Sequence, residues 1–126
     1  MKKIILGLFL VLTTLSADIE WLEYDDAIDK AQKENKIVMV MLGRSSCSVC
    51  KYMKTVVFKD KKIIPILNKK FLSVYIELDF DDVPEGLTYV GTPTFHFLDK
   101  NEKAIYRIDG GKTVPSFFKA ITDEIN

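Results

Sequence analysis

The sequence predicts a single α/β domain, because strand-like and helix-like segments alternate along it. Residues 37–42 are continuously apolar, which is typical of a strand buried on both faces of a sheet. Residues 71–78 are rich in β-branched and aromatic side chains, and a right-handed crossover would make them a parallel neighbour. Residues 94–98 and 104–108 predict a hairpin. We therefore expect a central mixed β-sheet flanked by helices.

The remaining elements are assigned from helical spacing and from helix start signals. Helices are expected at 25–34, from the cysteines toward residue 59, at 60–70 and at the C-terminus. Pro65 requires the third of these to start late or to kink. Thr113 as a cap and Pro115 in the first turn predict where the last helix begins. Residues 19–22 allow either a short edge strand or a lead into the first helix.

The N-terminus has the pattern of a secretory signal peptide. Lys2 and Lys3 precede an apolar run at 4–12 that fades into small and polar residues. A membrane span needs about 20 apolar residues, and this run is shorter. We expect a cleaved signal peptide at 1–17, a domain at 18–126, and a periplasmic or secreted protein. An uncleaved membrane tether is the alternative, because Leu15 is large for a cleavage site.

Composition and charge exclude several classes of function. The chain has 18 Lys and Arg against 18 Asp and Glu, so the loss of Lys2 and Lys3 with the leader would give a net charge of −2. Its basic residues are scattered, which argues against nucleic-acid binding. The remaining length is enough for a hydrophobic core, so no disulfide is required to hold a very small domain together.

Cys47 and Cys50, the only cysteines, follow the first strand in a Cys-x-x-Cys pattern. Cys47 would lie where a helix begins, among backbone N–H groups that favour a thiolate over a thiol. Because the thiolate is the reactive form, the pair is a candidate redox centre. Arg44 and Lys51 are nearby cations, although exposed charges act weakly through water. A structural disulfide, a metal pair and inert buried thiols are the alternatives.

Metal binding is disfavoured by the shortage of ligands. Zinc normally takes four nitrogen or sulfur ligands, and only His96 could join the two cysteines. His96 alternates with Phe95 and Phe97, so we interpret it as a packed or surface strand residue. The acidic loop at 79–90 lacks the spacing of a calcium site. We expect no metal and no bound cofactor.

Three features together resemble the thioredoxin superfamily. They are Cys47-Ser48-Val49-Cys50 after a buried strand, Gly91-Thr92-Pro93-Thr94-Phe95 at the start of a hairpin, and an amphipathic C-terminal helix. The resemblance covers roughly residues 20–126 and is closest to secreted thioredoxin-like proteins and to the C-terminal domain of transmembrane electron-transfer reductases. It implies a thioredoxin-like fold and a thiol–disulfide oxidoreductase.

The resemblance also assigns roles to residues. It implies that Cys47 is the nucleophile and Cys50 the resolving thiol, with Ser48 and Val49 as the dipeptide between them. It further implies that Thr92 and Pro93 bind substrate through a cis peptide bond that faces the cysteines. The implied partners are protein thiols and disulfides, together with a membrane or periplasmic electron donor. We expect a monomer.

Some positions depart from the pattern of familiar thioredoxins. Their buried Asp and its neighbouring Lys match Met41 and Tyr75 here, and the Trp before the first cysteine is Ser46. The dipeptide between the cysteines lacks the His of strongly oxidising relatives. We therefore expect a reductant or general exchange role rather than a strong oxidant. The alternative is a binding module that keeps the fold and has little redox turnover.

Overall fold

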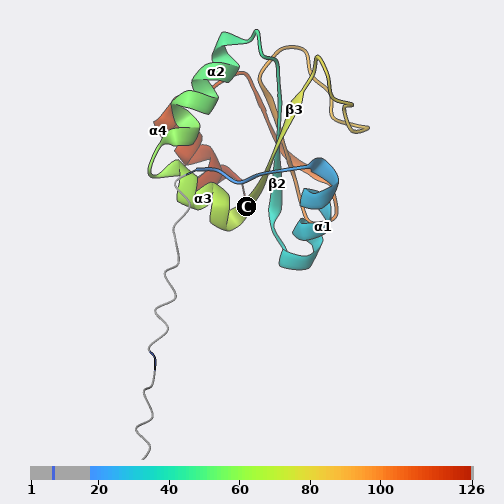
Figure 1. Ribbon diagram of the computed structural model, residues 1–126, viewed down its shortest axis with the longest axis vertical. Helices are drawn as coiled ribbons and strands as arrows, with labels where there is room; N and C mark the ends of the chain where they lie inside the picture. The colour runs from blue at the N-terminus through green and yellow to red at the C-terminus, as the bar shows by residue number, and fades with distance from the viewer. Residues whose placement is uncertain (1–6, 8–17, 126) are drawn as a thin grey trace, which may run out of the picture.

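The computed structural model describes residue 7 and residues 18–125, and the latter form a five-stranded mixed sheet with helices on both faces (Figure 1). The strands are β1 (Trp21–Leu22), β2 (Ile37–Gly43), β3 (Phe71–Glu77), β4 (Thr94–Leu98) and β5 (Ala104–Asp109). Their order across the sheet is β1-β3-β2-β4-β5. β1, β3 and β2 are parallel, whereas β4 is antiparallel to β2 and to β5. This is the mixed α/β sheet that the sequence predicts.

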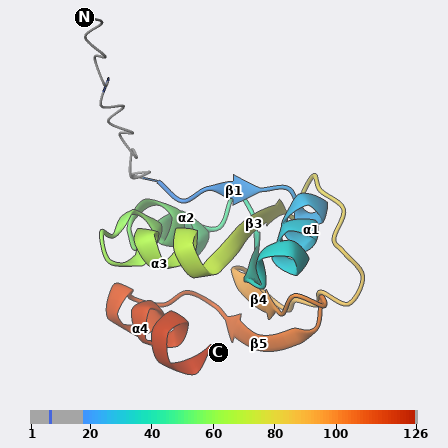
Figure 2. The same ribbon diagram turned by 90° about the horizontal axis from the view of Figure 1, so that it is seen from below.

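The helices are α1 (Tyr24–Glu34), α2 (Ser48–Thr55), the 3-10 helix η1 (Val57–Lys59), α3 (Ile63–Lys70), α4 (Val114–Lys119) and the π-helix η2 (Ala120–Glu124). α2, α3 and α4 cover one face of the sheet, and α1 covers the other (Figures 1 and 2). The predicted signal peptide at 1–17 lies outside the described residues, apart from residue 7. In the described part of the chain, no helix has the length and apolar character to cross a membrane.

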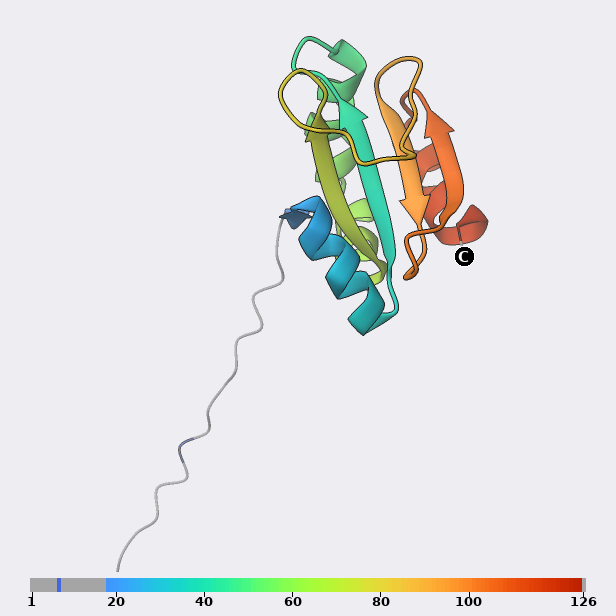
Figure 3. The same ribbon diagram turned by 90° about the vertical axis from the view of Figure 1, so that its right-hand side faces the viewer.

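The continuous apolar run of β2 is explained by helices on both sides of it. Met39 and Met41 point into the cluster formed with α2, α3 and α4. Val38, Val40 and Leu42 point into the cluster formed with α1. All five side chains have no exposed surface. β2 is therefore the central strand from which the cysteine turn emerges (Figure 3).

An aromatic cluster packs between α2 and the sheet. Phe58 of η1, Phe95 of β4 and Phe117 of α4 contact one another, with ring centroids 5.4, 5.8 and 6.1 Å apart. Such edge-to-face and tilted pairs add to the stabilisation from burial alone. The same core contains Cys50 and Met53 of α2. The helix that carries the cysteines therefore lies on a tightly packed base.

The segment between α2 and β3 differs in detail from the prediction. α2 ends at Thr55 and a separate 3-10 turn follows, instead of one helix that continues to residue 59. α3 begins at Ile63 rather than at Asp60, whose carboxylate accepts hydrogen bonds from the N–H groups of Lys62 and Ile63. Pro65 then falls in the first turn, where a missing N–H costs nothing. The late start is the one that Pro65 requires.

The first strand and the last helix agree with the sequence patterns, and the structure decides between the two interpretations of residues 19–22. Residues 19–22 contain the edge strand β1, in which Trp21 is in register with Ser73 of β3. At the other end, the Thr113 hydroxyl accepts the Ser116 N–H and Pro115 lies in the first turn of α4. The predicted cap and start of the last helix are confirmed.

Candidate active site

The two cysteines lie at the turn between β2 and α2, as predicted. Cys47 is the N-cap of α2, and its N–H donates to the carbonyl oxygen of Arg44 at 3.2 Å. Cys47 and Cys50 form a disulfide. The Cys50 N–H donates to Cys47 Sγ at 3.0 Å. A donor aimed at this sulfur, together with the positive end of the helix dipole, favours negative charge on Cys47.

The two sulfurs differ in their access to solvent. Cys47 is half-buried, whereas Cys50 is only 1% exposed and belongs to the core. Ser48 and Val49 between them are exposed. Solvent can therefore reach Cys47, whereas Cys50 is covered by the core.

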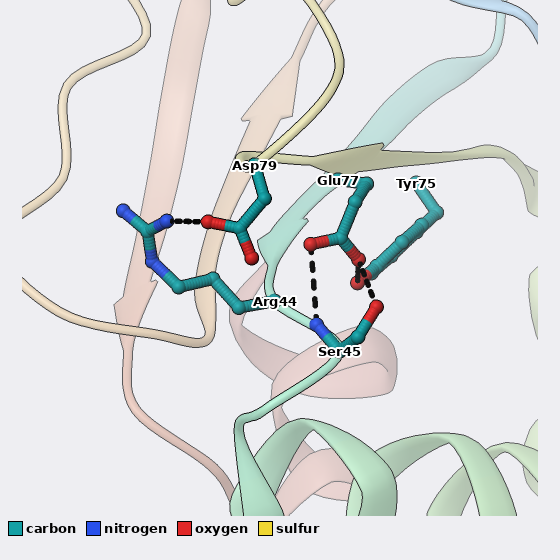
Figure 4. A network of polar contacts seen from close by, with 5 residues as sticks. All are labelled: Arg44, Ser45, Tyr75, Glu77 and Asp79. Atoms are coloured by element: carbon teal, nitrogen blue, oxygen red, sulfur yellow. Dashed lines mark hydrogen bonds and ion pairs between the residues drawn. The ribbon is translucent and has the colours of Figure 1, made fainter.

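A hollow of about 170 Å³ lies beside the disulfide. It is lined by both cysteines and by polar and basic side chains from the turn and from α2, namely Arg44, Ser45, Lys51, Lys54 and Thr55. Of its three cations, Arg44 is paired with Asp79 and Lys51 is exposed. The expectation that Arg44 acts on Cys47 is therefore weakened, because its charge is already matched by a carboxylate (Figure 4).

A hydrogen-bond network at the end of β3 fixes the turn before Cys47 (Figure 4). Glu77 accepts the N–H of Ser45 at 3.1 Å, the hydroxyl of Ser45 at 3.1 Å and the hydroxyl of Tyr75 at 2.9 Å. Burial alone would raise the pKa of Glu77, but these hydrogen bonds outweigh it and hold the pKa below its ordinary value. The Tyr75 ring lies so close to Gly43 that a Cβ there would meet it at 2.8 Å. The sequence does not reveal this network, because Ser45 lies in the turn after β2 and its partner Glu77 lies 32 residues away at the end of β3.

Lys54 is a second feature that the sequence analysis missed. Its Nζ lies 3.1 Å from the centroid of the Tyr75 ring, a cation–π contact. Burial lowers the pKa of Lys54, and the nearby Glu77 carboxylate opposes that change. The signal in the sequence was its position four residues after Cys50, which places both on one side of a helix.

Thr92 and Pro93 lie at the same end of the sheet as the cysteines. Thr94 is in register with Leu42, so the preceding residues lie next to the end of β2 from which the cysteine turn begins. The Thr92–Pro93 peptide bond is cis. Pro93 is buried, and its carbonyl oxygen accepts the Gly110 N–H at 2.8 Å. Thr92 and Pro93 line a separate hollow of about 240 Å³.

The segment after β5 packs against α2 at the cysteine turn. A Cβ on Gly111 would lie 2.4 Å from Cγ1 of Val49, so any larger residue there would force one of the two groups to move. The next residue, Lys112, donates its N–H to Met53 Sδ at 3.4 Å. Val49 of the dipeptide between the cysteines therefore lies against Gly111, although part of its side chain is exposed.

The other residues singled out in the sequence have structural positions. His96 is buried, and its Nε2 lies 2.7 Å from the carbonyl oxygen of Thr88, so it ties the loop at 79–90 to the sheet. Met41 and Tyr75 are in register on neighbouring strands. Met41 has no exposed surface, which leaves an apolar side chain where familiar thioredoxins carry an acid.

Solved structures share this fold. A thioredoxin from Thermus thermophilus is 27% identical with a TM-score of 0.69, and the match covers 82% of this chain and 85% of that one. A DsbH oxidoreductase is 18% identical with a TM-score of 0.66, and the match covers 84% and 85% of the two chains. A mixed sheet of this order, with a CxxC pair at the start of a helix, defines a thioredoxin-fold protein.

The family follows from the sequence match. The model of the Thioredox_DsbH family, described as a protein of unknown function, DUF255, matches residues 9–101, and the chain belongs to this family. The chain is also similar to the rat (Rattus norvegicus) spermatogenesis-associated protein 20, with 35% identity over 60 residues, or 47% of this chain. Thioredoxin H4-2 of Oryza sativa subsp. japonica is 31% identical over 88 residues, or 70% of this chain. The matches span 8% and 64% of the length of these two relatives.

Proposed function

We propose that this protein is an exported thiol–disulfide oxidoreductase that exchanges disulfides with protein substrates, and that it acts as a reductant rather than as a strong oxidant. The observation that carries the proposal is the pairing of an accessible Cys47 at the N-cap of α2 with a buried Cys50 behind it. In this proposal Cys47 is the nucleophile and Cys50 is the resolving thiol.

The reaction needs only the two sulfurs and a substrate disulfide. The Cys47 thiolate attacks one substrate sulfur, and the other substrate sulfur leaves as a thiolate that takes a proton from water. Cys50 then loses its proton to water and attacks Cys47 Sγ, so the second substrate sulfur leaves in the same way. Two electrons have passed from the cysteine pair to the substrate. A separate electron donor in the membrane or the periplasm must reduce the pair again.

The reductant role is supported by how little the site stabilises the thiolate. Strong oxidants have a reduced form that is greatly stabilised. Here Ser48 and Val49 carry no charge, and Arg44 is occupied by Asp79. The Cys47 thiolate is then stabilised mainly by the helix start and by the Cys50 N–H. We expect a reduction potential below about −200 mV, on the side of thioredoxin rather than near the about −120 mV of strong oxidants.

We assign substrate binding to Thr92 and Pro93 and export to residues 1–17. Support for the first assignment comes from the position of both residues at the cysteine end of the sheet, beside a hollow. Support for the second comes from Lys2, Lys3 and the apolar run that follows them. Residues 18–126 then form the mature domain in the periplasm or outside the cell.

The test combines turnover with trapping. Wild-type protein should catalyse the reduction of insulin disulfides by dithiothreitol, and Cys47→Ser should abolish this activity. Cys50→Ser should also fail to turn over, but should accumulate mixed disulfides that reductant releases. Thermal unfolding of each variant controls for loss of fold. Folded wild-type protein without exchange activity would overturn the proposal, and binding of a partner by the variant that lacks both thiols would then favour a binding module.

A further inference from the structure

Lys54 lies beside the hollow in which Cys50 would attack Cys47, the second step of the proposed reaction. Resolution of a mixed disulfide requires the Cys50 thiol to become a thiolate, and burial opposes that charge. Familiar thioredoxins carry a buried Asp that could accept this proton, but the matching position here is the fully buried Met41. Lys54 follows Cys50 by four residues on α2, so their Cβ atoms are about 5–6 Å apart. Both side chains line the hollow beside the disulfide.

The side chain of Lys54 is held in place from the sheet. Its Nζ contacts the Tyr75 ring, and the Tyr75 hydroxyl donates to Glu77 at 2.9 Å. The other charged groups near the hollow are Arg44, Lys51 and Glu77, and the first of these is paired with Asp79. Lys51 lines the same hollow but is exposed. Lys54 is therefore a half-buried cation that the Tyr75 ring holds and that lines the same hollow as Cys50.

We propose that the Lys54 ammonium group, positioned by the Tyr75 ring, stabilises the Cys50 thiolate while a mixed disulfide on Cys47 is resolved. This inference rests on the proposed function. The Cys50 S–H gives its proton to water, and the thiolate attacks Cys47 Sγ. The bond between Cys47 and the substrate sulfur breaks, and that sulfur leaves as a thiolate and is then protonated by water. Lys54 keeps its own proton throughout.

The expected effect follows from the size of a nearby charge. A nearby opposite charge lowers a pKa by about 1–3 units, and we take about 1 unit because Lys54 is half-exposed to water and its Nζ lies over the Tyr75 ring. Lys54→Met should therefore cut the Cys50 thiolate fraction at pH 7 about tenfold. The more basic thiolate is about threefold more nucleophilic, since reactivity rises with roughly the 0.4–0.5 power of basicity. The net expectation is resolution about threefold slower at pH 7.

The experiment separates the two steps with 5,5′-dithiobis(2-nitrobenzoate) and the reduced protein. Attack by Cys47 releases one thionitrobenzoate, and closure by Cys50 releases the second. Lys54→Met should leave the first phase unchanged and slow the second about threefold at pH 7. At a pH above both Cys50 pKa values the variant should be as fast as the wild type or faster. Lys54→Arg should restore the wild-type profile, and Lys62→Met, which removes an exposed cation at the start of α3 outside the hollow, should not slow the second phase.

A second variant keeps the inference testable if Lys54→Met is poorly folded. In Cys47→Ser, the absorbance of the Cys50 thiolate at 240 nm gives its pKa directly, and Lys54→Gln should raise it by about 1 unit. A second phase that Lys54→Met leaves unchanged, or slows equally at every pH, would overturn the inference. So would an Lys54→Arg variant as slow as Lys54→Met. Absence of the first phase in wild-type protein would instead contradict the proposed function.

Discussion

The close approach of Gly111 to Val49 gives a prediction that can be worked out from one distance. In Gly111→Ala the new Cβ would lie 2.4 Å from Val49 Cγ1, whereas ordinary contacts lie at 3.4–4 Å. One of the two groups must therefore move by about 1 Å. Overpacking of this kind costs about 1–3 kcal/mol in a core. Val49 is 43% exposed and can rotate toward solvent, so we expect about 1 kcal/mol.

Gly91→Ala is the matched control, because a Cβ there meets nothing within 4 Å. Both substitutions reduce the freedom of the unfolded chain equally, so their difference isolates the contact with Val49. Urea unfolding of the oxidised proteins should show Gly111→Ala less stable than Gly91→Ala by about 1 kcal/mol, and thermal unfolding should show a Tm lower by about 4 °C. Val49→Ala combined with Gly111→Ala should recover most of the loss. Equal stability of the two glycine variants would refute the reasoning.

Two further predictions concern groups that hold the site and the acidic loop. The pKa of Glu77 is lowered in the folded state, so its contribution to stability is present above its unfolded pKa of about 4.3 and is lost as the pH falls through the folded pKa. The stability difference between wild type and Glu77→Gln, measured by urea unfolding, should therefore shrink between pH 7 and pH 3, and a constant difference would contradict this. His96→Phe should remove the hydrogen bond to the carbonyl of the exposed Thr88, at a cost of about 1 kcal/mol, and should speed proteolysis within residues 79–90. Arg107→Leu, which removes a more exposed bond to the Thr88 hydroxyl, should have the smaller effect in both assays.

The features that could be predicted from the sequence are those set by local pattern. The apolar run of β2, the CxxC pair at the start of α2 and the capped start of α4 all depend on residues that are close together in the chain. The start of α3 was less well predicted. The Asp60 carboxylate accepts the N–H groups of Lys62 and Ile63, and the helix begins only at Ile63. A proline signals that a helix must start late, but it does not say at which residue.

The features that could not be predicted depend on contacts between distant segments. Gly111 follows the predicted hairpin in the sequence, and only the fold shows that Val49 lies against it. Arg44 looked like a cation for Cys47, but its carboxylate partner comes from the loop after β3. Exposed charges have many potential partners, so a sequence does not choose among them. For the same reason, the link from Lys54 through Tyr75 to the sheet was not foreseen.

The aromatic cluster beneath α2 has a consequence for the energetics of electron transfer. Phe58, Phe95 and Phe117 join three elements and do not involve the disulfide itself. These ring contacts do not depend on the sulfur–sulfur bond, so we expect both the oxidised and the reduced protein to keep them. A thermodynamic cycle then links the two forms: the difference between their unfolding free energies equals the difference in reduction free energy between the folded and the unfolded pair. Two unfolding curves would therefore measure how far the fold shifts the reduction potential of the pair.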